Sequence, residues 1–326
     1  MKLIILILFF NLFVYKLFGQ NPNENYFNNI CNAELALCDS NWSSSLCFYK
    51  KAFNEKKLDS YSFDLHNAIV CASLTNKVKD AKKFAKMLIL KGCDSAYFNK
   101  KCFEKLRTYK SWSRTIKSLP IKQPNKKNTN LATIIDSLYT KDQSRDENRK
   151  SYFSSNAKFL KKEIEFNSYP SEAVIGIKIE NNRFIDKTSF MLYHYKSYHR
   201  SDDIDSLLFI SVKKGDMHPV YFAWLPFKKA IYNYSIKENN ALLVIGTELY
   251  EANPRTAHLV EINKKRKEIY LPEFDHFKKI TKFYLKDRRF VYPVDGRIII
   301  IESFADETSK ERLLKEYKLV GTYNTN

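Results

Sequence analysis

Residues 63–92 read FDLHNAIVCASLTNKVKDAKKFAKMLILKG, and this stretch decides the fold class. Its apolar residues recur at the three- and four-residue spacing of a helical face. The first stripe is Leu65, Ala68, Ile69 and Ala72, and the second is Val78, Ala81, Ala85, Leu88 and Ile89. Asn76 is a candidate cap between the two helices, and Gly92 stands where a left-handed helix stop is expected. Small alanines in both stripes predict two closely packed antiparallel helices, an αα-hairpin.

Helical spacing extends outward from this hairpin and then changes character. It predicts a repeat-like N-terminal domain over residues 24–119, and residues 120–130, PIKQPNKKNTN, are typical of a linker. Beyond the linker, further helices are expected near 131–142, 157–166, 189–198, 203–214 and 221–234. Three β-branched runs at 241–245, 258–262 and 297–301 predict strands, with a turn at 294–296 and a last helix over 303–321.

The predicted fold class is therefore mainly α. An N-terminal α-hairpin repeat-like domain precedes an α-rich α+β domain that has a small C-terminal sheet. The second domain is expected over residues 131–278, and residues 279–326 are expected to add a β-hairpin and a helix. Hydrophobic residues make up 44% of the 326 residues, which is enough for packed cores and excludes a disordered chain.

Composition also limits the function. The seven glycines form neither a GxG nor a GxxxxGK loop, which excludes glycine-based cofactor cradles, and we expect no cofactor. The formal charge of +19 favours anionic headgroups, acidic glycans or cell-wall polymers as partners, with a solvated lysine-rich surface as the alternative. Nucleic acid is not indicated, because no motif interleaves aromatic and basic residues.

The first residues predict export. Met1 and Lys2 precede a short apolar run, and Gly19 supplies a small residue near a cleavage point, so residues 1–19 are predicted to be a signal peptide. An uncleaved membrane anchor is the alternative, although it would place Lys16 in lipid. We therefore expect a periplasmic or secreted protein that has no transmembrane segment after signal removal.

Cysteine usage agrees with export. An even, clustered set in an exported chain favours disulfides, whose pairing the sequence leaves open, and buried free thiols are the alternative. The spacing fits no zinc finger, so we expect no metal site. The six candidates are Cys31, Cys38, Cys47, Cys71, Cys93 and Cys102.

Two family resemblances follow from quoted segments. Residues 46–116, which include AFNEKKLDSYSFDLHNAIV and FNKKCFEKLRTYKSW, resemble the tetratricopeptide-like helical repeats of exported bacterial proteins. The glycine of the usual first helix is absent, and only about two hairpins can be fitted. This resemblance implies a protein-binding or scaffolding surface.

The second resemblance is carried by LYTKDQSRDENR (138–149), LYHYK (192–196), ALLVIGTELY (241–250) and EINKKRKEIYLPEFDHF (261–277). In order and spacing they resemble the bacterial family called domain of unknown function 6624, over about residues 131–278. The matching positions are Asp142, Gln143, Arg145, His194, Gly246, Thr247 and Arg266. The sequence departs from the family where Pro226 and Phe227 replace an aspartate–arginine pair, so a family site that uses this pair would be incomplete here.

Asp142, Arg145 and His194 are the candidate catalytic residues. Asp142 and Arg145 are three apart on a predicted helix, and His194 lies on an inward-looking stripe, so they can form either a polar site or a structural network. No recognisable catalytic motif is present, and the first hypothesis is a binding module for a protein or an anionic envelope polymer. The alternative is a hydrolase-like enzyme in which His194 acts as the general base and Arg145 holds an anion.

Overall fold

We describe a computed structural model of the chain. The residues that it describes are 22–56, 59–118, 128–144, 148–180, 183–199, 203–225, 242–245, 248–252, 256–292, 298–301 and 317–322. The predicted signal peptide, residues 120–127 of the predicted linker and the predicted turn at 294–296 lie outside these ranges.

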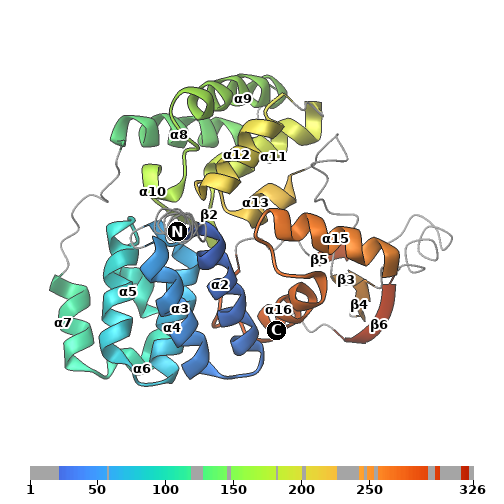
Figure 1. Cartoon of the computed structure of the whole chain (residues 1–326). Coiled ribbons are helices and arrows are strands. Elements are labelled where there is room, and N and C mark those ends of the chain that lie inside the picture. The colour runs from blue at the N-terminus through green and yellow to red at the C-terminus, as the bar shows by residue number, and fades with distance from the viewer. Residues whose placement is uncertain are drawn as a thin grey trace, which may run out of the picture.

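The N-terminal part is an array of helices that lie side by side in the lower half of Figure 1. Consecutive long helices pack as α2 against α3 and α4 against α5, and α7 closes one edge beside α5. The elements are α2 (Pro22–Cys38), α3 (Trp42–Lys56), α4 (Ser62–Leu74), α5 (Val78–Leu90), the 3-10 turns η2 (Ser95–Asn99) and η3 (Lys101–Phe103), α6 (Glu104–Arg107) and α7 (Lys110–Ser118).

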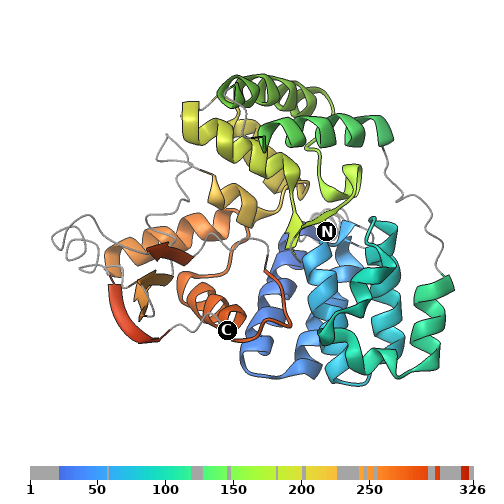
Figure 2. The same cartoon turned by 180° about the vertical axis from the view of Figure 1, so that it is seen from behind.

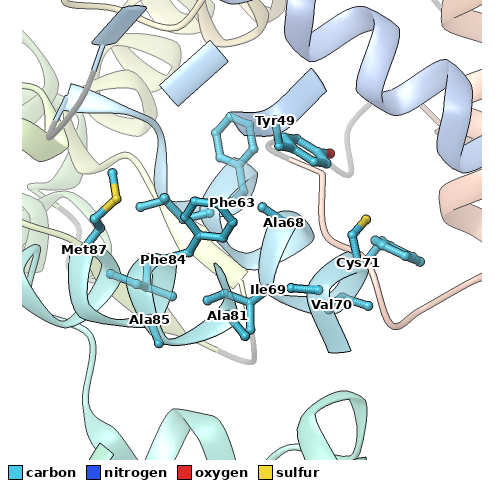
Figure 3. Packing of buried hydrophobic residues seen from close by; sticks show 14 of the residues in the cluster. Tyr49, Phe63, Ala68, Ile69, Val70, Cys71, Ala81, Phe84, Ala85 and Met87 are labelled. Carbon is cyan, nitrogen blue, oxygen red and sulfur yellow. The ribbon is translucent and has the colours of Figure 1, made fainter. Parts of the chain in front are cut away.

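The α4–α5 hairpin confirms the close packing that the sequence predicts. Ala68 and Ala72 of α4 and Ala81 and Ala85 of α5 are completely buried, and Figure 3 shows Ala68, Ala81 and Ala85 within this hydrophobic cluster. Because alanine adds little bulk at the contact, the two helix backbones approach closely.

The predicted capping role of Asn76 is wrong. The N-cap of α5 is Lys77, and Asn76 adopts a left-handed φ of 59° after the end of α4. The amides of Asn76 and Lys77 donate to the Ser73 and Ala72 carbonyls at 3.3 and 2.8 Å, which is the Schellman pattern. Asparagine tolerates a left-handed backbone better than most residues. Asn76 therefore ends α4, although asparagine is also a favoured N-cap residue.

A second helical group lies above the array in Figure 1. Its core includes Leu160, Leu192 and Leu208, all fully buried, which join three helices into one packed unit. The elements are α8 (Thr129–Asp142), α9 (Arg149–Phe166), α10 (Glu172–Ile175), α11 (Lys187–His199), α12 (Asp205–Lys214) and α13 (Pro219–Trp224).

The strands form two small sheets. β1 (Lys178–Glu180) and β2 (Arg183–Ile185) pair as an antiparallel ribbon. The other sheet has the order β5-β3-β4-β6, in which β3 pairs parallel with β5 and the other two pairs are antiparallel. Its strands are β3 (Leu242–Ile245), β4 (Glu248–Ala252), β5 (Ile298–Ile301) and β6 (Tyr317–Thr322). The mainly α fold with a small sheet is thus confirmed, as are the predicted strands at 241–245 and 297–301.

Three C-terminal predictions need correction. The run at 258–262 belongs to the helix α15 (Thr256–Glu268), whose buried residues Ile262 and Arg266 are spaced by the helical period. The end of the predicted helix over 303–321 is instead strand β6. The boundary expected after residue 278 falls inside α16 (Phe274–Lys286), which packs against α2 of the N-terminal array.

The segment after α16 also attaches to the array, through polar side chains of α4. The Asn67 amide donates to the Val291 carbonyl and accepts from the Val291 N–H, both at 2.8 Å. His66 donates from Nε2 to the Arg289 carbonyl at 2.9 Å, while its Nδ1 accepts from the Tyr97 hydroxyl. This side of α4 is therefore covered by the protein's own chain.

All six cysteines are free thiols in this structure. Cys31 and Cys38 are both on α2, where seven residues rise about 10 Å along the axis, too far for a disulfide. Burial raises the pKa of the Cys71 thiol to about 12, which keeps it protonated. The predicted disulfides are thus absent from this structure, and Cys71 and Cys93 match the alternative of buried free thiols.

No helix among the described residues is long and apolar enough to span a bilayer.

Candidate functional site

Two of the three predicted site residues lie together. Asp142 is the last residue of α8, whose buried face also carries Leu131, Ile135 and Tyr139 at helical spacing. This face turns the Asp142 side chain inward as well, and α11 brings His194 to it. The helical period of the sequence therefore sets the direction of both side chains, and the packing of α8 with α11 makes them meet.

The contact is a short histidine–carboxylate hydrogen bond. His194 Nδ1 lies 2.6 Å from Asp142 Oδ2, and Gln143 Nε2 donates to the same oxygen at 2.6 Å. Because a carboxylate accepts, Nδ1 carries the proton, and Nε2 is the ring nitrogen that can accept one. Asp142 is fully buried, whereas the His194 side chain is 18% exposed. This dyad, as we call Asp142 and His194, therefore has a buried orienting group and an accessible base.

Aromatic rings enclose one side of the dyad. The Phe153 ring lies 5.1 Å from the His194 ring, between centroids. Next to His194 in sequence, Tyr193 stacks face to face on Trp224, at 4.1 Å and 6°. Low polarity on this side strengthens the hydrogen bond between the carboxylate and the imidazole.

The structure places the other predicted residues differently. Arg145, Gly246 and Thr247 lie outside the described residues. Arg266 is 3% exposed and is anchored where α15 leads into α16, because its Nε donates to the Pro272 carbonyl at 2.6 Å and its guanidinium lies over the Phe277 ring. The dyad is thus the part of the predicted site that the described residues bring together.

A second candidate site is a basic surface on α5 and α7, which pack together. Each helix carries three exposed cations at i, i+4 and i+7, which is one stripe of a helix. None of the six forms an ion pair with a residue that the structure describes. We call this set the basic face: Lys79, Lys83 and Lys86 of α5, and Lys110, Arg114 and Lys117 of α7.

Each basic stripe can be recognised in the sequence, but the sequence does not show that the two helices pack together. Each basic residue of the first stripe is about 30 residues from its counterpart in the second, so the six look dispersed along the sequence. The two views show α5 and α7 together at the edge of the array that lies away from the four-stranded sheet (Figures 1 and 2). The acid on these helices, Asp80, is paired with Lys50 of α3 at 3.1 Å.

In the part of the chain that the structure describes, no group of three or more histidine, cysteine or acidic side chains is placed to hold a metal ion. No protein-family model, curated protein or solved structure matches the chain. The resemblances to tetratricopeptide-like repeats and to the domain of unknown function 6624 therefore rest on the quoted segments alone.

Proposed function

We propose that this protein is an exported binding protein that holds an anionic envelope polymer on the basic face. The observation that carries this proposal is the set of six exposed cations on two packed helices, none of them neutralised by a neighbouring acid among the described residues. The formal charge of +19 adds long-range attraction for a polyanion. A repeating anionic chain, such as an acidic glycan, fits two neighbouring rows of cations better than a single small anion does.

The basic face on α5 and α7 is favoured for this role over the side of α4 that carries polar side chains. The side of α4 that carries His66 and Asn67 is covered by residues 289–291, so a ligand bound there would displace the protein's own backbone. The basic face needs no such displacement, because its six side chains are exposed.

Reversing three charges on the basic face should abolish most of the binding. We expect the triple variant Lys79→Glu, Lys83→Glu, Lys86→Glu to bind dextran sulfate about 100-fold more weakly at low salt, since each cation near an anionic surface contributes about 1 kcal/mol. Affinity should be measured by retention on the immobilised polymer with rising salt. Wild-type retention should vanish towards about 0.5 M, where the screening length is about 4 Å.

A matched control separates the basic face from net charge. The triple variant Lys158→Glu, Lys264→Glu, Lys267→Glu changes the charge equally on exposed lysines of α9 and α15. It should lose much less affinity than the α5 variant. Equal losses in both variants, or retention that salt does not weaken, would contradict the proposal.

The dyad favours a second function, hydrolase-like general base catalysis. In this proposal His194 Nε2 removes a proton from water or from a substrate hydroxyl, and Asp142 holds the imidazole in the required tautomer. The combination of an accessible imidazole with a fully buried carboxylate partner supports it. Arg145, two residues after Gln143, would then hold an anionic group of the substrate.

His194→Ala should test this second function against a purely structural role. If His194 is a general base, the variant should lower any turnover of chromogenic esters or phosphoesters by about 100- to 10,000-fold without lowering the melting temperature. His199→Ala is the control, since His199 is on the same helix and bonds to the Ser154 hydroxyl at 2.9 Å. A loss of several degrees in His194→Ala, with no turnover by the wild type, would identify a structural network instead.

A further inference from the structure

A pair of buried polar side chains joins α2 to α4 inside the N-terminal array, and it is independent of the basic face and of the dyad. The Tyr26 hydroxyl of α2 donates to Asp64 Oδ2 of α4 at 2.6 Å. The same hydroxyl accepts from the N–H of Tyr61, just before α4, at 3.1 Å. Tyr26 and Asp64 are both completely buried. The contact between the two helices therefore includes a carboxyl group that is shielded from solvent.

The surroundings of Asp64 are poor in hydrogen-bond donors. Its second oxygen, Oδ1, is buried and has no hydrogen-bond partner among the described residues. An ionised carboxylate can accept about four hydrogen bonds, and burial without them disfavours the charged form. The single bond from Tyr26 leaves most of this capacity unused. The geometry thus favours the neutral acid.

Among the described residues, no cation pairs with Asp64 to stabilise a negative charge. Two charged groups act on it from farther away. Lys56, at the end of α3, favours the anion, but its ammonium donates to the Gly215 carbonyl at 2.7 Å. Glu172 of α10 disfavours the anion and is itself paired with Lys91.

The other titratable groups around Asp64 come from several elements. Glu34 of α2 is buried as well, and it accepts from the Tyr284 hydroxyl of α16 at 3.5 Å. On the α5 side, α4 meets the apolar residues Ala81 and Ala85. The remaining groups are tyrosines whose pKa burial raises well above the ordinary value, so they stay uncharged: Tyr26, Tyr49, Tyr61, Tyr221 and Tyr284. These neighbours add no positive charge.

Burial raises the pKa of Asp64 to about 8. The hydrogen bond from Tyr26 and the charge of Lys56 act in the opposite direction, as does the N-terminus of α4, in whose first turn Asp64 lies. Burial is the largest of these effects, so the Asp64 carboxyl is mostly protonated at neutral pH.

We propose that Asp64 is a pH-sensitive switch that controls the attachment of α2 to α4. At neutral pH the protonated carboxyl remains in the core, and α2 stays packed on α4. At alkaline pH the O–H bond breaks, its electron pair stays on the carboxylate, and the proton passes to water or hydroxide. A buried negative charge without a paired cation then weakens the contact between the helices. Because α2 also packs against α16, this loosening reaches the C-terminal part of the chain.

The direction of the pH dependence follows from proton linkage. The pKa of Asp64 in the folded state lies above its ordinary value of 3.8, so the folded state holds the proton more tightly and stability falls as pH rises towards 8. Burial also raises the pKa of Asp186 to about 6 and lowers the pKa of His66 to about 3 and of Lys56 to about 8. These three shifts act below about pH 6.5 or above about pH 8. Between about pH 6.5 and 7.5, we therefore expect the folding equilibrium constant to fall by up to about tenfold per pH unit.

Urea unfolding across this pH range measures the slope, and hydrogen exchange of the α2 amides shows where it acts. Asp64→Asn keeps the shape of the side chain but cannot ionise, so it should lose the slope. From pH 7 to pH 9, the protection of α2 relative to its intrinsic exchange rate should fall about tenfold in the wild type and stay constant in Asp64→Asn. Glu24→Gln is the control, because it removes a carboxylate from an exposed position of α2 and should keep the wild-type slope.

Three results would overturn the proposal. Equal stability of the wild type across the range, or a slope that persists in Asp64→Asn, would show that Asp64 does not hold the proton. Unchanged protection of α2 at pH 9 would show that ionisation does not loosen this helix. If Asp64→Asn does not fold, Tyr26→Phe replaces it. Loss of the bond that favours the anion should then move the midpoint of the change in α2 protection to higher pH, and an unmoved or lower midpoint would contradict the switch.

Discussion

Asp205→Ala should lower the free energy of unfolding by about 3–5 kcal/mol, because it leaves the Lys196 ammonium buried without its carboxylate. Both side chains are completely buried, and the ion pair joins α11 to α12 inside the second helical group. Urea unfolding followed by circular dichroism would measure the loss as a lower midpoint with an unchanged slope.

A nearby surface pair provides the control. Lys161 and Asp203 lie 3.2 Å apart, with side chains 38% and 42% exposed. Asp203→Ala should therefore cost less than about 1 kcal/mol. The double variant Lys196→Met, Asp205→Leu should recover most of the lost stability, because two apolar side chains of similar size remove both desolvated charges. A small effect of Asp205→Ala alone would show that Lys196 is satisfied by other groups.

Gly215→Ala should be the second most damaging change, with an expected loss of about 2–3 kcal/mol. Gly215 ends α12 with a left-handed φ of 77°, which a residue with a Cβ adopts at a cost. An added Cβ would also lie 2.2 Å from Asn23 Oδ1 and 2.7 Å from Lys56 Nζ. The lysine cannot move away without losing its bond to the Gly215 carbonyl, which the Tyr61 hydroxyl also contacts at 3.0 Å.

The contribution of the clash can be separated from that of the backbone. Asn23→Ala in the Gly215→Ala background removes the closest atom, so it should restore only the part of the stability that the clash costs. The loss of stability that remains is then caused by the left-handed backbone of residue 215 and by the contact with Lys56. Unfolding by urea measures both variants, and an unchanged midpoint in Gly215→Ala would contradict the expected strain.

Much of the N-terminal array could be predicted because helix formation here follows local spacing. The αα-hairpin over residues 63–92 was predictable from small and large apolar residues at i, i+3 and i+4, and the observed α4 and α5 end within a few residues of the prediction. The run at 258–262 shows where the same reasoning failed. Its β-branched residues favour a strand, but burial of Ile262 and Arg266 on one face stabilises helix α15.

The candidate site was partly predictable for the same reason. Asp142 and His194 each continue an apolar helical stripe, so the sequence indicated that both point inward. Their 2.6 Å contact required α8 and α11 to pack together. The basic face was not predicted, because its members come from two helices that the sequence does not align.

The sequence by itself determined which segments are helical and which side of each helix is buried, since these properties depend on neighbours within a few residues. Only the tertiary structure decided that residues 289–291 cover α4 and that α16 joins the N-terminal core. Such contacts join residues far apart in the chain, and they form when whole helices bury their apolar faces against one another.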